Sequence, residues 1–189
     1  MNLFSGFYRS GADWFPVGLS SSFPDLGDDD DIISAPRTCN DKAKPGCKVF
    51  QVPTTDSTQA SEVEVSEDSI NAYEGDGELK TQVLVFQYRG KFHAIDHQCP
   101  HSSFPLSKGT PFDIEDFGVV LSAGLTCPKH GWSFDLFHGT SDRGHYKLKV
   151  WEVQLRDIKG AVPPILSGEA DSSEKPDKEV WVRRKQRMG

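Results

Sequence analysis

Two short segments, each with one cysteine and one histidine, constrain what this chain can form more than any other feature. The first is CPH, at Cys99 to His101, and the second is CPKHGW, at Cys127 to Trp132. Their pattern is C-x-H, a spacer of 25 residues, and then C-x-x-H. Thiolates and imidazoles are both metal ligands, so a fold that brings these segments together creates a site with two sulfur and two nitrogen donors.

This donor set suits a 2Fe-2S cluster whose two irons are inequivalent. If one iron takes the thiolates of Cys99 and Cys127 and the other takes the imidazoles of His101 and His130, two tight loops hold both irons at once. Neutral imidazoles in place of two thiolates make the reduced cluster less unfavourable, which raises the reduction potential to about −150 to +300 mV. Such potentials suit the transfer of single electrons to an oxygenase or a cytochrome.

A structural zinc site is the main alternative. Two cysteines and two histidines satisfy tetrahedral Zn²⁺ equally well. Zinc sites more often place two cysteines or two histidines in one loop, whereas each loop here holds one of each. The mixed loops therefore favour the iron–sulfur interpretation over a zinc-stabilised interaction module.

The sequence around these loops is typical of a small antiparallel β domain. From Lys48 onward, short β-branched and aromatic runs are separated by Gly, Pro and Asp, and no amphipathic helix is predicted before Leu155. Arg89-Gly90 separates two of these runs, as a two-residue connection that closes a hairpin. The predicted strands are residues 48–52, 81–88, 91–96, 118–121, 147–155 and 179–185.

Both Cys/His segments, with their surroundings, resemble the cluster-binding loops of the Rieske family. KFHAIDHQCPHSSFPLSKG resembles the family's strand and loop at the first ligand pair, and CPKHGWSFDLFHG resembles the second loop with its following strand and turn. The resemblance covers roughly residues 49–155. It implies an all-β fold, a Rieske (ISP-domain-like) antiparallel β-sandwich with a small cluster-binding subdomain of two loops. It also implies one 2Fe-2S cluster held by Cys99, His101, Cys127 and His130.

Three positions depart from the respiratory and photosynthetic members of that family. Phe104 and Lys129 stand where those proteins carry two further cysteines, so no disulfide joins the loops. Trp132 stands where they carry a hydroxyl-bearing residue whose hydrogen bond stabilises the reduced cluster. The loss of that hydrogen bond implies a potential in the lower half of the range, as in Rieske ferredoxins and oxygenase domains.

Residues 1–47 are predicted to be a flexible N-terminal extension. Gly, Ser and Pro, together with the acid run Asp28 to Asp31, give neither a helical nor a strand period there. The Rieske domain is predicted over residues 48–186, with a loop insertion at 163–178 before the last strand. The extension is rich in aromatic residues that could dock on this domain or on a partner, namely Phe4, Phe7, Tyr8, Trp14, Phe15 and Phe23.

Charge and hydropathy restrict the partners and the location. The 189-residue chain has a formal net charge of −7, which disfavours nucleic acid and anionic membranes and favours a basic docking partner. No apolar run reaches the roughly 18 to 20 residues of a membrane span, and the N-terminus has no targeting pattern. We therefore expect a cytoplasmic protein, in which Cys39 and Cys47 remain thiols rather than a disulfide.

These features predict a soluble Rieske-type ferredoxin that carries single electrons between a reductase and an oxygenase or another acceptor. A Rieske oxygenase needs a further domain with a mononuclear iron held by two histidines and a carboxylate, and too little chain is left for one. The chain is interpreted as an electron-transfer component of an oxidoreductase system, without catalytic residues, rather than a stand-alone enzyme. The alternative is a Rieske subunit of a larger oxidoreductase, docked through the aromatic N-terminal extension.

Overall fold

The computed structural model describes residues 13–27, 46–64, 79–158 and 176–185. These ranges contain no α-helix, and none of their helical turns is long or apolar enough to cross a membrane. The strands are β1 (Phe15–Leu19), β2 (Cys47–Gln51), β3 (Ser61–Val63), β4 (Gln82–Tyr88), β5 (Lys91–Asp96), β6 (Thr110–Asp116), β7 (Val119–Cys127), β8 (Trp132–Asp135), β9 (Glu152–Asp157) and β10 (Lys178–Arg183). Short 3-10 turns occur at Ser20–Ser22, Ser57–Gln59, Leu79–Thr81 and Leu106–Lys108.

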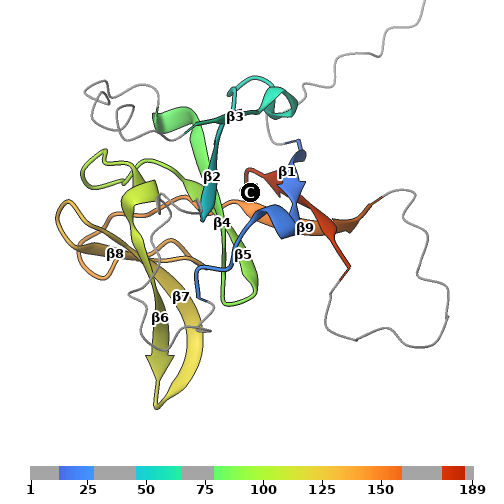
Figure 1. The fold of residues 1–189 in the computed structure, drawn as a ribbon. Coiled ribbons are helices and arrows are strands. Elements are labelled where there is room, and N and C mark those ends of the chain that lie inside the picture. The colour runs from blue at the N-terminus through green and yellow to red at the C-terminus, as the bar shows by residue number, and fades with distance from the viewer. Residues whose placement is uncertain (1–12, 28–45, 65–78, 159–175, 186–189) are drawn as a thin grey trace, which may run out of the picture.

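The strands form three antiparallel sheets, ordered β1-β10-β9, β3-β2-β4-β5 and β6-β7-β8, with the four-stranded sheet between the other two (Figure 1). Side chains of β4 alternate between two hydrophobic clusters. Leu84 and Phe86 pack with residues of β7 and β8, whereas Val83 and Val85 pack with residues of β1 and β10. Because both of its faces are covered, β4 is a nearly continuous apolar run. This architecture confirms the predicted all-β antiparallel sandwich.

The turn between β4 and β5 is the predicted two-residue hairpin. Arg89 and Gly90 both have left-handed backbones, with φ of 50° and 71°, as this type of tight hairpin turn requires. The carboxylate of Asp25 accepts hydrogen bonds from the backbone N–H groups of both residues. An acidic residue from the predicted N-terminal extension therefore caps a turn of the domain.

Residues 13–27 correct the prediction of a flexible extension. β1 pairs with β10 in the β1-β10-β9 sheet, which we call the outer sheet. Phe15, Val17 and Phe23 are buried between this outer sheet and the four-stranded sheet. Ser20, which follows β1, donates a hydrogen bond to Asp177, 157 positions later in the chain. Because the partners are so far apart in sequence, a local sequence pattern does not reveal the pairing of β1 with β10. Other parts of the predicted extension and the loop insertion lie outside the described residues, namely Phe4, Phe7, Tyr8, Asp28 to Asp31, Cys39 and most of 163–178.

The segment predicted as one strand over 147–155 is also different. β9 begins only at Glu152, after the chain has run along the edge of β5. Leu148 is buried in the cluster that contains the site cysteines, but Trp151 is buried in the other cluster and donates a 2.8 Å hydrogen bond to Asp96. Trp151, the one apolar residue out of phase with the predicted strand, marks where the chain passes from one layer to the next.

His93 on β5 is expected to make the protein less stable in acid. Its ring stacks on Phe86 with the ring centres 5.5 Å apart, and its Nε2 is buried without a hydrogen-bond partner among the described residues. Burial lowers the pKa of His93 from 6.5 to about 4; Lys91 adds to this effect, while Asp25 and Asp135 oppose it. The folded state therefore binds this proton less readily than the unfolded state. The contribution of the neutral His93 ring to the free energy of unfolding is complete above pH 6.5 and is lost as the pH falls towards 4.

When the pH falls from neutral to about 4.5, we expect the free energy of unfolding to decrease by about 2 to 3 kcal/mol less in His93→Phe than in the parent protein. Phenylalanine keeps the stacking on Phe86 and has no proton to bind. Urea unfolding of both proteins at the two pH values measures the difference. If the variant loses as much stability in acid as the parent protein, the buried imidazole is not the group responsible.

Candidate metal centre

The two Cys/His segments form loops with the same backbone geometry. In each loop the cysteine carbonyl accepts a hydrogen bond from the N–H group four residues later, from Ser103 to Cys99 at 2.9 Å and from Gly131 to Cys127 at 3.0 Å. Both donor residues are left-handed, with φ of 52° and 67°. The glycine adopts this conformation without steric cost. Each loop is therefore a tight turn that begins at a cysteine.

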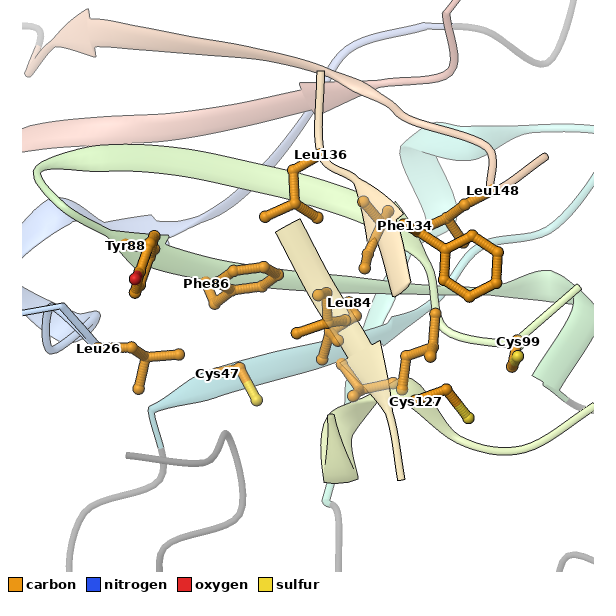
Figure 2. Packing of buried hydrophobic residues seen from close by; sticks show 14 residues of the cluster. Leu26, Cys47, Leu84, Phe86, Tyr88, Cys99, Cys127, Phe134, Leu136 and Leu148 are labelled. Atoms are coloured by element: carbon orange, nitrogen blue, oxygen red, sulfur yellow. The ribbon is translucent and has the colours of Figure 1, made fainter. Parts of the chain in front are cut away.

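The side chains of Cys99 and Cys127 lie together at one end of the core cluster (Figure 2). A hydrogen bond between the two sulfurs lowers the pKa of Cys99 to about 5 and, together with burial, raises the pKa of Cys127. The Ser102 side chain and the N–H groups of His101 and Ser102 further favour the Cys99 thiolate. A bound metal ion would favour the thiolate form of both cysteines.

The imidazoles of His101 and His130 form a second pair. Their ring centres are 5.1 Å apart and the rings are nearly perpendicular, at 80°. Nδ1 of His101 is buried and has no hydrogen-bond partner in the described part of the chain. A buried polar atom left in this way costs about 1 to 3 kcal/mol, and a bond to a metal would satisfy it.

The structure therefore brings all four predicted ligands to one end of the core, grouped by chemistry. Among the described residues, no three His, Cys, Asp or Glu side chains are gathered as ligands of a single ion. Two sulfurs form one pair and two imidazoles form the other. A 2Fe-2S cluster with one thiolate-bound iron and one imidazole-bound iron requires such pairs, so these residues fit that group.

Aromatic rings enclose His101 but leave His130 exposed. The indole of Trp132 stacks on His101 with the ring centres 4.4 Å apart, and Tyr146 packs edge-on against His101 at 5.1 Å. The guanidinium of Arg143 lies 5.5 Å from the centre of the Trp132 ring. His101 is half-buried, whereas the second loop exposes His130. The His130 imidazole is therefore the more accessible of the two.

A hydroxyl group reaches the sulfur pair from a residue that the sequence did not single out. Ser102 Oγ lies 3.8 Å from Cys127 Sγ, within hydrogen-bonding range for sulfur. Trp132, which replaces the family's hydroxyl-bearing residue, instead stacks on His101. Hydrogen bonds to the sulfurs influence the reduction potential of such clusters. Ser102 therefore supplies, from the first loop, a contact of the kind that Trp132 lacks.

Phe104 and Lys129, which replace the cysteines of the interloop disulfide, contact each other. Nζ of Lys129 lies 5.7 Å from the centre of the Phe104 ring, and Nζ of Lys108 lies 6.0 Å from it. An exposed cation–π contact contributes about 0.5 to 1 kcal/mol. The two loops are linked at the position of the missing disulfide, but by a weak and reversible contact.

His97 anchors the start of the first loop. Its ring is buried between Gln82 and Ser107, with each ring nitrogen 2.8 Å from a side-chain oxygen. Burial lowers the pKa of His97 to about 4, so the ring is neutral at physiological pH. Its carbonyl accepts a hydrogen bond from the N–H of Leu106, beyond the loop. Nothing in the sequence pattern distinguishes His97 from His93, so this role becomes visible only in the structure.

Comparison with known proteins places these observations in one family. Residues 47–150 match the family model described as the Rieske [2Fe-2S] domain. Human apoptosis-inducing factor 3 is 41% identical over 59 residues, which cover 31% of this chain and 8% of that protein. The methanesulfonate monooxygenase ferredoxin subunit of Methylosulfonomonas methylovora is 32% identical over 82 residues, which cover 41% of this chain and 58% of that protein. Both matches span less than two thirds of the relative.

A solved complex of reduced oxygenase and oxidized ferredoxin in carbazole 1,9a-dioxygenase is also similar. The alignment has a TM-score of 0.44 and 16% identity, and it covers 93% of this chain and 97% of that one. The family match is the stronger result, because it spans more than half of the chain, from β2 to β8, and includes both Cys/His loops. The chain therefore belongs to the Rieske [2Fe-2S] domain family, whose domain binds a 2Fe-2S cluster.

Proposed function

We propose that this protein is a Rieske-type electron carrier, which holds its cluster through Cys99, His101, Cys127 and His130. It passes single electrons between a reductase and an oxygenase or another acceptor. The observation that carries this proposal is the grouping of two buried sulfurs and two imidazoles at one end of the core. The bound cluster supplies a centre that accepts and releases one electron.

The surrounding residues have distinct tasks in this proposal. The core excludes water from the sulfurs, and Trp132 and Tyr146 cover the half-buried imidazole of His101. His130 stays open to solvent and forms the point at which an electron partner approaches. The relatives support this role, because two are named as the ferredoxin subunit of methanesulfonate monooxygenase and the ferredoxin component of an alkene monooxygenase system.

Spectroscopy of the anaerobically purified protein tests the proposal. We expect broad visible absorption that bleaches with dithionite, and a rhombic electron paramagnetic resonance signal of low average g after reduction. Metal and sulfide analysis is expected to give two irons and two sulfides per chain. A colourless protein that contains zinc instead would show that the four residues form a structural site, and the carrier role would have to be abandoned.

The predicted N-terminal docking and cytoplasmic location belong to the same proposal. Phe15 and Phe23 are buried in this domain, and the guanidinium of Arg183 lies 4.6 Å from the centre of the Trp14 ring. A docking role therefore falls to the remaining aromatic residues of the predicted extension, Phe4, Phe7 and Tyr8. Its support is the aromatic content of that segment.

A further inference from the structure

Positively charged side chains surround the candidate metal centre, although the chain as a whole is acidic. Lys129 is exposed next to His130, and Arg143 donates a 2.6 Å hydrogen bond to the carbonyl of Gly131 in the same loop. The three segments at this end are 97–109, 127–132 and 138–149. Together they contain five lysine and arginine residues but a single carboxylate, Asp142.

The charge of that carboxylate is already compensated. Asp142 forms an ion pair with Arg143 at 2.9 Å and accepts a hydrogen bond from the N–H of Ser133. Lys129 and Lys147 have no carboxylate partner in the described part of the chain, and both are exposed. The described residues around His130 therefore carry an excess of positive charge.

A pocket of about 560 Å³ continues this surface from Lys147 and Lys149. Its lining adds two further cations, Arg184 and Lys185. Among the described residues that line the pocket, one is a carboxylate, Asp96, which lies 3.6 Å from the Lys149 ammonium group and accepts a hydrogen bond from Trp151. We use the term basic surface for Lys129, Arg143, Lys147 and Lys149 together with the pocket residues Arg184 and Lys185.

Acidic side chains lie at the opposite end of the β6–β7 hairpin. Glu115 and Asp116 are exposed on β6 next to the hairpin turn, which projects from the body of the protein (Figure 1). From Val119 at that turn, β7 runs eight residues to Cys127, a distance of about 26 Å at the usual rise per residue. Charge is therefore unequally distributed along this hairpin, with acidic residues far from the metal centre.

We propose that the basic surface is the docking face for a redox partner that presents acidic side chains. The inference rests on the proposed function, because it takes the electron to leave beside His130. Charges within about 10 Å dominate an encounter at 0.1 M salt, so the local cations outweigh the distant acids. Net charge favours a basic partner, whereas the residues beside the metal centre favour an acidic one.

Small oxidants of known charge test the sign of this local field. In the reaction, one electron leaves the reduced protein and converts ferricyanide, an anion, to ferrocyanide. We expect this rate to fall about five-fold or more as salt rises from about 10 mM to about 500 mM, because salt screens an attraction. With cationic hexaamminecobalt(III) the rate is expected to rise with salt. The opposite pair of salt dependences would overturn the proposal.

Lys147→Glu is the most informative variant, because Lys147 lies outside both ligand loops. We expect it to slow ferricyanide oxidation several-fold at low salt and to have little effect at high salt. Lys91→Glu makes the same change of net charge at the β4–β5 turn, at the far end of β5 from the metal centre, and serves as the control. Equal effects of the two substitutions would show that net charge alone matters and would refute the basic surface.

Binding of labelled peptides gives a second readout that does not depend on electron transfer. Fluorescence anisotropy is expected to show that a fluorescein-labelled polyglutamate peptide binds the full-length protein more weakly after Lys147→Glu than after Lys91→Glu. Tighter binding of a single-stranded DNA oligonucleotide than of polyglutamate would point to a nucleic acid and overturn the choice of an acidic protein.

The two proposals fail in different ways. If the carrier role is wrong, no visible cluster absorption is found and neither oxidant takes an electron from the protein. If only the docking inference is wrong, the cluster is present and both oxidants react, but the salt dependence has the wrong sign or Lys147→Glu behaves like Lys91→Glu. The visible spectrum of each variant also shows whether a slow reaction reflects a lost cluster.

Discussion

Replacement of Cys99 or Cys127 by serine is expected to leave the protein almost free of iron and without its visible absorption. The two sulfurs lie against each other, so the loss of either one breaks the pair that would hold one iron. Serine is nearly the same size, but its hydroxyl is far less acidic than a thiol and is a poor ligand for iron in such clusters. Iron, sulfide and zinc contents of the purified variants, with their visible spectra, measure the effect.

Cys47→Ser is the matched control for this experiment. Cys47 is buried in the same hydrophobic cluster but lies near Leu26, at the end opposite to Cys99 and Cys127 (Figure 2). The same atom is changed in the same core, so a general loss of packing affects all three variants alike. We expect Cys47→Ser to keep its iron. Similar iron contents in Cys99→Ser and Cys47→Ser would remove Cys99 from the ligand set.

Gly139→Ala is expected to destabilise the protein by about 3 kcal/mol or more. Gly139 has a left-handed φ of 74°, and a Cβ atom at this position would overlap the carbonyl oxygen of Leu148. The carbonyl of Gly139 also accepts a 2.8 Å hydrogen bond from the N–H of Leu148. This contact closes the segment that carries Arg143 and Tyr146 to the metal centre. Urea unfolding, followed by tryptophan fluorescence, gives the change in stability.

A second glycine separates the two causes of this loss. Gly118, in the β6–β7 turn, has a similar φ of 77°, but nothing lies within 4 Å of a Cβ atom built there. Gly118→Ala therefore bears only the cost of a left-handed alanine, about 1 kcal/mol. A loss of stability in Gly139→Ala no larger than in Gly118→Ala would contradict the predicted overlap with Leu148.

Local patterns made part of the fold predictable. The hairpin of β4 and β5 follows from two apolar runs and the intervening Arg89-Gly90, since both the strand period and the turn are encoded by neighbouring residues. The two tight Cys/His loops are visible for the same reason, because each cysteine lies within three residues of its histidine. Features whose partners are close in sequence were therefore recovered.

Features that depend on partners distant in sequence were not predicted. Residues 15–19 have no strand pattern of their own, and β1 becomes a strand because β10 and the four-stranded sheet cover it. The start of β9 was misplaced for a related reason, since Trp151 belongs to a different layer from Leu148. Which layer a side chain enters depends on the arrangement of the sheets, and alternation within one segment does not contain that information.

The surroundings of the metal centre show the same division. The four proposed ligands were selected from their spacing, but Tyr146 covers His101 from a segment 45 residues later. The link between Phe104 and Lys129 joins the two loops through space. The sequence shows that Phe104 and Lys129 cannot form a disulfide. The contact between these two side chains is apparent only from the three-dimensional structure.

The pairing of β1 with β10 has a consequence for the synthesis of the chain. A ribosome makes β1 about 160 residues before its partner, so Phe15 and Val17 emerge with no strand on which to pack. The sheets around the metal centre can close earlier, since β2 to β8 are complete once Asp135 has been made. Contacts between such distant residues also form slowly. Cluster insertion can therefore precede the last folding step, in which the outer sheet covers the remaining apolar face.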